Sequence, residues 1–378
     1  MFEKTKAFCD SFLEYGLPGF DLAVYKDGEC ILRHMGGYSD LENGTKINGD
    51  ERYNIYSCSK PITCTAAMQL WEKGLFSLED KLSDYMPEFE HMTVKTEDGV
   101  KEAENPIRIH HLFEMTAGLT YNTKSDNIKQ GLADTDGRLP TREAMKYIAK
   151  DPLAFEPGER WNYSLCHDVL AALVEVISGE KFEDYVKKNI FEPLGMSRST
   201  FMLPEEEVEG LAQQYRFENG APRNVGKHIV TYKIGTEYAS GGAGCISTVN
   251  DYMKFLEGLR TGKLVKPETL KFMTTDRLTK HQKSTYWVEN HGYGLGLRCY
   301  QEGGRLHDIG WGGAAGAYLA IDVEKGISLY CAMHLLSSPV QGIRGLLYRF
   351  ILAELFDQSE FDRLREDLKS LHDYNLTY

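Results

Sequence analysis

The sequence lacks the features that define three large classes of protein. No run of five basic residues occurs, and a formal net charge of -13 at pH 7 opposes phosphate binding, so we exclude nucleic acid as a partner. No apolar stretch of eighteen residues occurs either, so we expect no spanning helix and no membrane partner. The N-terminus mixes charged residues into the region where a signal peptide needs an apolar core, which predicts a cytoplasmic protein.

Motifs for metals, cofactors and disulfides are also missing. The eight cysteines are scattered with no Cys-x-x-Cys pair, which predicts reduced, mostly buried thiols rather than a zinc site or a disulfide framework. The eleven histidines contain no His-Glu-x-x-His pattern, and no glycine-rich phosphate loop is present. We therefore expect neither a metal nor an organic cofactor. The Gly-x-Ser-x-Gly motif of the α/β-hydrolases is absent too, so any serine chemistry needs another arrangement.

What is present is the composition of a soluble globular protein, with strand patterns at both ends of the chain. Of the 378 residues, 42% are hydrophobic and 26% are charged, which suits a large buried core. Residues 20–37 predict a β-hairpin that turns at Asp27-Gly28, because this pair tolerates the positive φ of a tight turn. Residues 317–333 predict a second strand pair, and residues 340–355 predict a final amphipathic helix.

Helical patterns dominate the middle of the chain. Apolar residues at helical spacing follow Ser57, and residues 168–177 show the same periodicity. Strands first, helices inserted and strands last predict an α+β fold, an α/β sandwich with one antiparallel sheet flanked by helices. We assign residues 1–60 and 236–378 to this sheet domain and residues 61–235 to an inserted, mainly helical domain.

The first chemical signal is a serine followed three residues later by a lysine, a spacing that occurs twice. In Ser178-Gly179-Glu180-Lys181 the serine lies beside a glycine at a helix end, so its lysine is expected in solvent. In Ser57-Cys58-Ser59-Lys60 the serine begins an apolar helix, where unpaired amides and the helix dipole favour negative charge. Lys60 lies on the same helical face, and a buried ammonium is costly, so Lys60 could accept the serine proton. The spacing alone nevertheless favours an N-cap serine and a solvated lysine.

Longer motifs change that balance. Residues 155–165 read Phe-Glu-Pro-Gly-Glu-Arg-Trp-Asn-Tyr-Ser-Leu, and together with Ser57-x-x-Lys60 they resemble the serine β-lactamase and penicillin-recognising hydrolase superfamily. Within it, the chain is most similar to class C β-lactamases and family VIII carboxylesterases. Further segments that match the family in the correct order are residues 74–89, 110–119, 190–196 and 240–248. The resemblance covers most of the chain and implies the β-lactamase/transpeptidase-like fold.

The resemblance also implies a catalytic group. Tyr163 falls on the family's catalytic tyrosine, and a phenol near a lysine ammonium is stabilised as phenolate, so it can pass protons between serine and leaving group. Ser57, Lys60 and Tyr163 are therefore the expected catalytic residues. We place the oxyanion hole at the backbone amides of Ser57 and Ala314.

Two departures from the β-lactamase pattern bear on the substrate. Leu165 replaces the Asn of Tyr-x-Asn, and Lys-Thr-Gly is missing, since Arg260-Thr261-Gly262 reads as a helix end. Trp311-Gly312-Gly313 instead resembles the Trp-Gly-Gly variant of family VIII esterases. A lysine at 311 would bind a substrate carboxylate, whereas Trp311 and Leu165 offer an apolar wall for a neutral ester. Gly312 and Gly313 allow close approach of the backbone.

We therefore expect a serine hydrolase that cleaves small-molecule carboxylic esters, with amides as related substrates, through an acyl-enzyme on Ser57. The acyl group passes to water or to another alcohol. The alternatives are a β-lactamase or D-amino-acid peptidase and, outside enzymes, a binding or scaffold protein that has kept the fold. His307 and Cys58 are minor candidates, because a histidine at a strand end and a buried thiol are more often structural.

Overall fold

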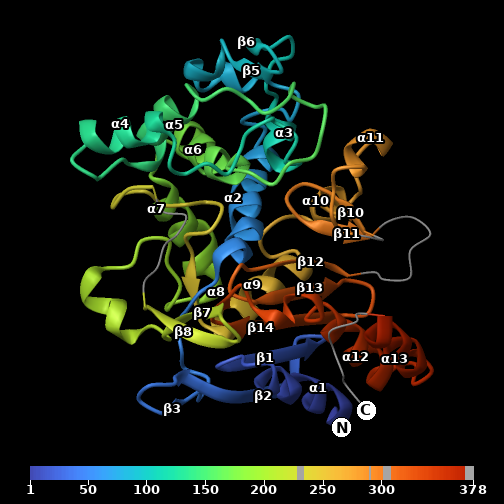
Figure 1. The fold of residues 1–378 in the computed structure, drawn as a ribbon. Coiled ribbons are helices and arrows are strands. Elements are labelled where there is room, and N and C mark those ends of the chain that lie inside the picture. The colour runs from blue at the N-terminus through green and yellow to red at the C-terminus, as the bar shows by residue number, and fades with distance from the viewer. Residues whose placement is uncertain (228–233, 289–290, 301–307, 371–378) are drawn as a thin grey trace.

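The centre of the structure is an eight-stranded antiparallel sheet with the order β10-β11-β12-β13-β14-β1-β2-β3 (Figure 1). The computed structural model describes residues 1–227, 234–288, 291–300 and 308–370. The strands of this sheet are β1 Gly19–Lys26, β2 Glu29–Asp40, β3 Thr45–Lys46, β10 His291–Tyr293, β11 Arg298–Tyr300, β12 Ile309–Gly312, β13 Tyr318–Asp322 and β14 Ile327–Met333.

Both ends of the chain contribute to the sheet, as the sequence predicts. Strand β1 lies between β2 and β14, with Phe20 opposite Met333. The β1–β2 hairpin turns at Asp27 and Gly28, whose φ values of 52° and 89° fit the mirror-image turn that two-residue hairpins require. The predicted hairpin, the late strand pair and the α+β fold class are all confirmed.

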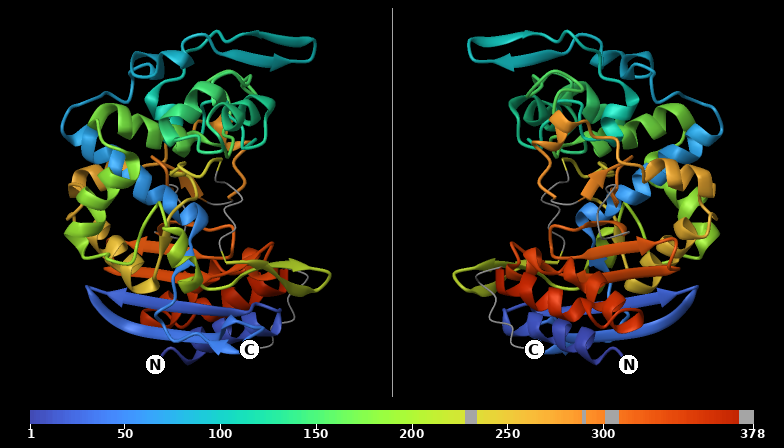
Figure 2. Two further views of the ribbon diagram at one scale, coloured as in Figure 1. Left: turned by 90° about the vertical axis from the view of Figure 1, so that its left-hand side faces the viewer. Right: turned by 90° about the vertical axis from the view of Figure 1, so that its right-hand side faces the viewer.

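Helices cover both faces of the sheet. Helices α1 (Glu3–Glu14), α12 (Leu346–Leu355) and α13 (Glu360–Ser370) lie on one face, at the bottom of both views in Figure 2. Along β1, Phe20, Leu22 and Val24 join the apolar cluster of these helices, whereas Ala23 joins the larger cluster of the other face. This alternation is the period of two expected for a strand buried on both sides.

The helical part of the molecule lies above the sheet, with helix α2 running between them (Figure 2). Its helices, and those against the second face of the sheet, are α2 Lys60–Glu72, α3 Ile109–Phe113, α4 Asp126–Asp134, α5 Thr141–Ile148, α6 Cys166–Ser178, α7 Phe182–Val186, α8 Glu192–Leu194, α9 Val249–Arg260, α10 Pro267–Met273 and α11 Lys280–Lys283. Small sheets complete it, namely the pair β4 Tyr53–Asn54 with β9 Ile246–Ser247, the pair β5 Thr93–Thr96 with β6 Gly99–Glu102, and a three-stranded sheet with β7 Gln214–Glu218 between β8 Ala221–Gly226 and β15 Leu335–Leu336.

One predicted helix begins later than the sequence pattern indicates. The expected helix over residues 340–355 is helical only from Leu346, because residues 339–342 form a separate 3-10 turn and Gly345 is the N-cap. Glycine has a low helix propensity, so Gly342 and Gly345 favour a break there. The predicted helix over residues 168–177 is confirmed as α6.

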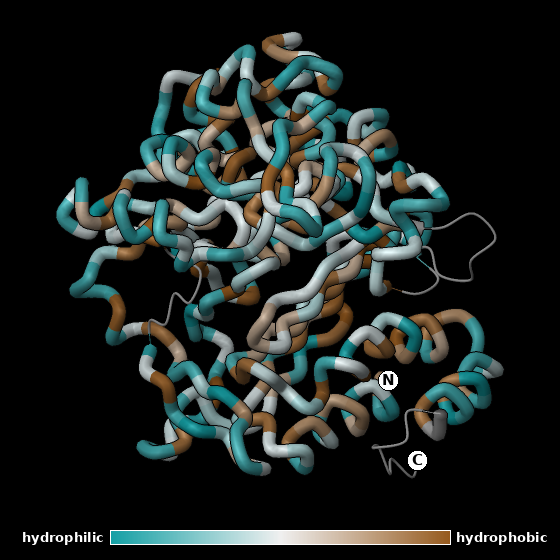
Figure 3. The backbone as a smooth tube through the Cα atoms, turned by 45° about the horizontal axis from the view of Figure 1, so that its top comes forward, coloured by the Kyte–Doolittle hydropathy of each residue, from teal (hydrophilic) through white to brown (hydrophobic). Residues whose placement is uncertain are grey.

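Apolar side chains fill the space between the layers. In Figure 3 the hydrophobic stretches of the backbone gather in the interior and the hydrophilic stretches lie mostly on the outer loops. In the part of the chain that the structure describes, every helix is too short or too polar to cross a bilayer. Seven of the eight cysteines are buried and unpaired, and only Cys30 is exposed, in line with the expected buried thiols.

Candidate active site

Ser57 lies in a 3-10 turn, Tyr56–Ser59, that leads directly into α2. The turn follows β4, and Tyr56 has a left-handed φ of 48°, a conformation that is uncommon and strained for a bulky residue. Ser57 is 8% exposed, so its hydroxyl faces a restricted space rather than open solvent. A strained turn at the start of a buried helix therefore positions the candidate nucleophile, and this local strain has no signature in the sequence.

The structure brings together the three side chains that the sequence predicts to be catalytic. Tyr163 Oη donates a hydrogen bond to Ser57 Oγ at 2.6 Å, and Lys60 Nζ donates to the same oxygen at 3.3 Å. Lys60 Nζ also lies 4.4 Å from the centre of the Tyr163 ring. Tyr163 comes from the loop before α6, so two distant segments meet at one hydroxyl.

Lys60 is fully buried and surrounded by oxygen acceptors. Its Nζ donates to Gly242 O at 2.7 Å and to Tyr121 Oη at 3.4 Å, besides Ser57 Oγ. These three acceptors match the three N–H groups of an ammonium. The arrangement therefore satisfies a buried cation with neutral groups in direct contact.

A buried carboxylate stands behind this arrangement. Asp168 on α6 is fully buried, and its Oδ1 accepts a hydrogen bond from Ser240 Oγ at 2.6 Å. A side chain at Gly242 would collide with the Asp168 carboxylate, so glycine allows the backbone that binds Lys60 to pass close to that carboxylate. Burial raises the pKa of Asp168, whereas the Ser240 hydrogen bond and the charge of Lys60 act in the opposite direction. The nearby carboxylate thus partly balances the charge of Lys60.

Two aromatic residues have contacts that sequence reasoning missed. Trp311 was expected only as an apolar wall, yet its Nε1 donates to Tyr163 Oη at 3.3 Å, and the rings stack with centres 5.7 Å apart. Tyr121 was not singled out, although it contacts Lys60 and stacks on Tyr163 at 5.6 Å. Neither contact has a sequence signal, because each depends on how separate loops pack.

A cleft of about 990 Å³ opens in front of Ser57. It is lined by Ser57, Tyr121, Tyr163, Trp287, Val288, Arg298, Trp311, Gly312, Gly313, Ala314, Tyr318, Gln341, Gly342, Arg344 and Gly345. The expected residues Trp311, Gly312, Gly313 and Ala314 all lie here. The lining therefore combines aromatic side chains with two arginines.

The remaining predicted residues fall into different environments. The structure does not bring Leu165 to the cleft: it is 3% exposed and packs in the core as the N-cap of α6, so it cannot form the expected apolar wall. Cys58 is fully buried, and burial raises the pKa of its thiol to about 12, which fits a structural role. His307 lies outside the described residues. Ser57 and Ala314 both line the cleft, and the role of their amides as an oxyanion hole remains a prediction.

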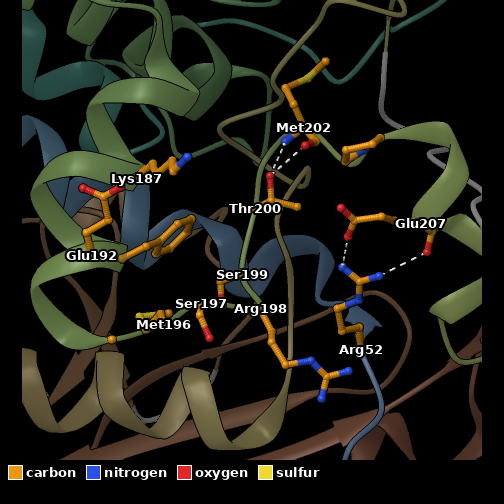
Figure 4. A pocket seen from close by; sticks show the side chains of 13 residues that line it. Arg52, Lys187, Glu192, Met196, Ser197, Arg198, Ser199, Thr200, Met202 and Glu207 are labelled. Atoms are coloured by element: carbon orange, nitrogen blue, oxygen red, sulfur yellow. Dashed lines mark hydrogen bonds and ion pairs between the residues drawn. The ribbon is translucent and has the colours of Figure 1, made fainter.

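A second hollow, of about 530 Å³, lies near α8 (Figure 4). Arg52 on its wall donates to the Glu207 carboxylate at 2.6 Å, as the dashed lines show. The other cations of this hollow, Lys187 and Arg198, are exposed. Among the described residues, no group of three His, Cys, Asp or Glu side chains could hold a metal ion, here or in the cleft.

The chain belongs to the β-lactamase family. A family model described as Beta-lactamase matches residues 4–352. Among curated relatives, the esterase EstB of Burkholderia gladioli is 28% identical over 374 residues, covering 90% of this chain and 91% of that protein. The ML-236A carboxylate methylbutanoyltransferase of Penicillium citrinum is 29% identical over 237 residues, covering 59% and 56% of the two chains. The named relatives of this family member thus include a hydrolase and an acyltransferase.

Solved structures agree on the fold. The structure of EstCE1, described as a hydrolase with promiscuous acyltransferase activity, has a TM-score of 0.77 at 24% identity and covers 92% of this chain and 97% of its own. A D-stereospecific amidohydrolase from Streptomyces has a TM-score of 0.68 at 20% identity, covering 93% of this chain and 98% of its own. At these identities the likeness shows the shared β-lactamase/transpeptidase-like architecture.

Proposed function

We propose that this protein is a serine esterase that forms an acyl-enzyme on Ser57 and passes the acyl group to water or to an alcohol. The observation that carries the proposal is the convergence of Tyr163 Oη, at 2.6 Å, and Lys60 Nζ, at 3.3 Å, on Ser57 Oγ. A hydroxyl held between a phenol and an ammonium is the arrangement that activates a weak nucleophile.

The contacts of Lys60 suggest how the proton moves. All three N–H groups of its ammonium have acceptors, so Lys60 acts as a cation that stabilises negative charge on Tyr163. The Tyr163 phenolate takes the proton of Ser57 as Oγ attacks the ester carbonyl, and the Trp311 N–H supports the same oxygen. Tyr163 then returns the proton to the departing alcohol, and a water or alcohol repeats the cycle on the acyl-enzyme.

The preference for esters rests on the walls of the cleft. Trp311 occupies the position where β-lactamases carry a lysine, and its ring stacks on Tyr163 beside the nucleophile. Trp287, which is 60% exposed, extends this aromatic surface, with its ring centre 5.4 Å from that of Tyr163. An apolar acyl or alkoxy group would bury this surface on binding.

Labelling with a fluorophosphonate tests the nucleophile. We expect stoichiometric modification of the wild-type protein and of the Ser178→Ala variant, and no modification of the Ser57→Ala variant. The rate at which Ser57→Ala hydrolyses 4-nitrophenyl butanoate should fall roughly a thousandfold or more. A wild-type protein that is neither labelled nor active on nitrophenyl esters would overturn the proposal in favour of a binding protein. Turnover of nitrocefin without turnover of any ester would indicate a β-lactamase instead.

A further inference from the structure

Two arginines line the cleft, and their surroundings differ. Arg298 on β11 forms an ion pair with Asp308 and a hydrogen bond to Tyr318 Oη at 3.2 Å. Arg344, just before α12, donates from Nη1 to Gly313 O at 2.9 Å and forms no ion pair with a carboxylate in the described part of the chain. The charge of Arg298 is therefore paired within the protein, whereas no carboxylate of the described residues pairs with Arg344.

The titration of the two groups reflects this difference. Burial lowers the pKa of Arg298, but the charge of Asp308 together with Tyr318 and Tyr286 outweighs that effect, so its pKa is raised. Burial lowers the pKa of Arg344 to about 10, because nearby thiols and Tyr318 compensate little of the lost hydration. Arg344 is still a cation at neutral pH, and the residues that the structure describes supply it with a carbonyl but with no carboxylate.

The strand beside Arg344 is shaped to accommodate it. A side chain at Gly312 would collide with Arg344 Nη2, so glycine at this position lets the guanidinium lie flat against the end of β12. The Gly313 carbonyl uses one of the five N–H groups of the guanidinium, which leaves donors for a ligand that enters the cleft. Ser57, Gly312 and Arg344 line the same cleft, so a ligand held by Arg344 also reaches the nucleophile.

We infer that Arg344 forms a carboxylate-binding subsite, so that the preferred substrates are esters that carry one negative charge at a position that reaches Arg344 when the ester group lies at Ser57. The inference rests on the proposed esterase function and names its substrate class. A planar guanidinium binds a carboxylate with two parallel hydrogen bonds, which a neutral group cannot match. The subsite would provide, from the segment just before α12, the anion recognition that a lysine at position 311 of β12 would otherwise supply. The carboxylate belongs to the acyl part or to the alcohol part of the ester, and the two possibilities are separable.

Matched pairs of esters test the subsite, because an isopropyl group has the shape of a carboxylate without its charge. The acyl pair is mono-4-nitrophenyl adipate and 4-nitrophenyl 6-methylheptanoate, and the alcohol pair is 3-carboxyphenyl butanoate and 3-isopropylphenyl butanoate. We expect the wild-type enzyme to favour the anion in one pair by about tenfold or more in kcat/KM, as a charge-assisted hydrogen bond provides. The pair that shows the preference identifies the part of the ester that carries the charge.

Variants assign the preference to Arg344. Arg344→Gln keeps a donor for Gly313 O but loses the charge, so the ratio of anionic to neutral turnover falls about tenfold or more, while Arg344→Lys retains part of it. Arg349→Gln removes a charge from α12, at a residue paired with Glu360, and leaves the ratio unchanged. No preference in either ester pair, or an equal loss on both members of a pair in Arg344→Gln, would overturn the inference.

Binding measurements separate this inference from the esterase proposal. In Ser57→Ala, which cannot form an acyl-enzyme, isothermal titration with the same esters measures affinity without turnover. Tighter binding of the anionic ester, lost in Ser57→Ala/Arg344→Gln, supports the subsite even if the wild-type protein hydrolyses no ester. Equal affinity for the anionic and neutral members of both pairs rejects the subsite even if Ser57 is labelled and active.

Discussion

The same four-residue spacing, serine to lysine, occurs in two regions of this molecule with opposite results. Ser57 and Lys60 are buried at the start of α2, where Lys60 has no exposed surface. Ser178 and Lys181 lie at the end of α6, where Lys181 is exposed and Ser178 Oγ accepts a hydrogen bond from the Glu180 amide at 3.1 Å. Whether the motif can take part in catalysis thus depends on its burial, on the end of the helix at which it lies and on the side chains that other segments place beside it.

Replacing each of the two lysines by methionine is the strongest test of the difference between the two motifs. Lys60→Met keeps the length and packing of the side chain but removes the cation that stabilises Tyr163, so kcat/KM on a neutral ester falls by about a thousandfold. Lys181→Met alters only an exposed charge and stays within about twofold. Steady-state kinetics checks both, with circular dichroism to show that each variant is folded; similar losses in the two variants would contradict the distinction.

The phenol that reaches Ser57 from a distant loop is the second difference. Tyr163→Phe removes the proton acceptor and should lower kcat by roughly a hundredfold or more, because general acid–base catalysis typically contributes that much. Tyr121→Phe removes an acceptor of Lys60 and leaves the hydrogen bond between Tyr163 and Ser57 in place, so a loss of about tenfold is expected. The ranking is the test: a larger loss in Tyr121→Phe would place the proton acceptor at position 121.

The buried surroundings of the first motif also make it sensitive to acid. Burial lowers the pKa of His167 from the ordinary 6.5 to about 3, and the charge of Lys60 acts in the same direction. Between pH 6.5 and pH 3 this histidine is protonated in the unfolded chain but not in the folded protein. The free energy of unfolding is therefore highest above pH 6.5 and declines as the pH falls toward 3. His167 then contributes a slope of about 1.4 kcal/mol per pH unit, measurable by urea unfolding between pH 7 and pH 4.5.

Replacing the histidine isolates this effect. His167→Gln should flatten the decline of stability with falling pH, although His111, whose pKa burial also lowers to about 3, leaves part of the slope. His281→Gln, at an exposed position on α11, should leave the slope as it is in the wild type. An unchanged slope in His167→Gln would show that the protonation of other groups governs acid unfolding.

The sequence predicts those features of the site that short-range patterns encode. Ser57 and Lys60 share one helical face, Tyr163 lies in a recognisable segment, and Asp27-Gly28 specifies the hairpin turn that the structure contains. The positions of Asp168, Tyr121 and Arg344 depend instead on contacts between segments far apart in the chain, and no local pattern specifies such contacts. Leu165 is a residue for which the motif was misleading. Its position in the motif suggested that it lines the cleft, whereas the packing of α6 buries it in the core.

The arrangement of the sheet has a consequence for synthesis of the protein. Strand β1 is synthesised long before β14, yet it lies between β2 and β14, so Phe20 meets its partner Met333 only after all the intervening residues have been made. The cleft wall from Trp311 to Ala314 is also made late. A nascent chain therefore carries Ser57 long before it can hold that residue in a working site, and its activity begins only when the last strands have joined the first.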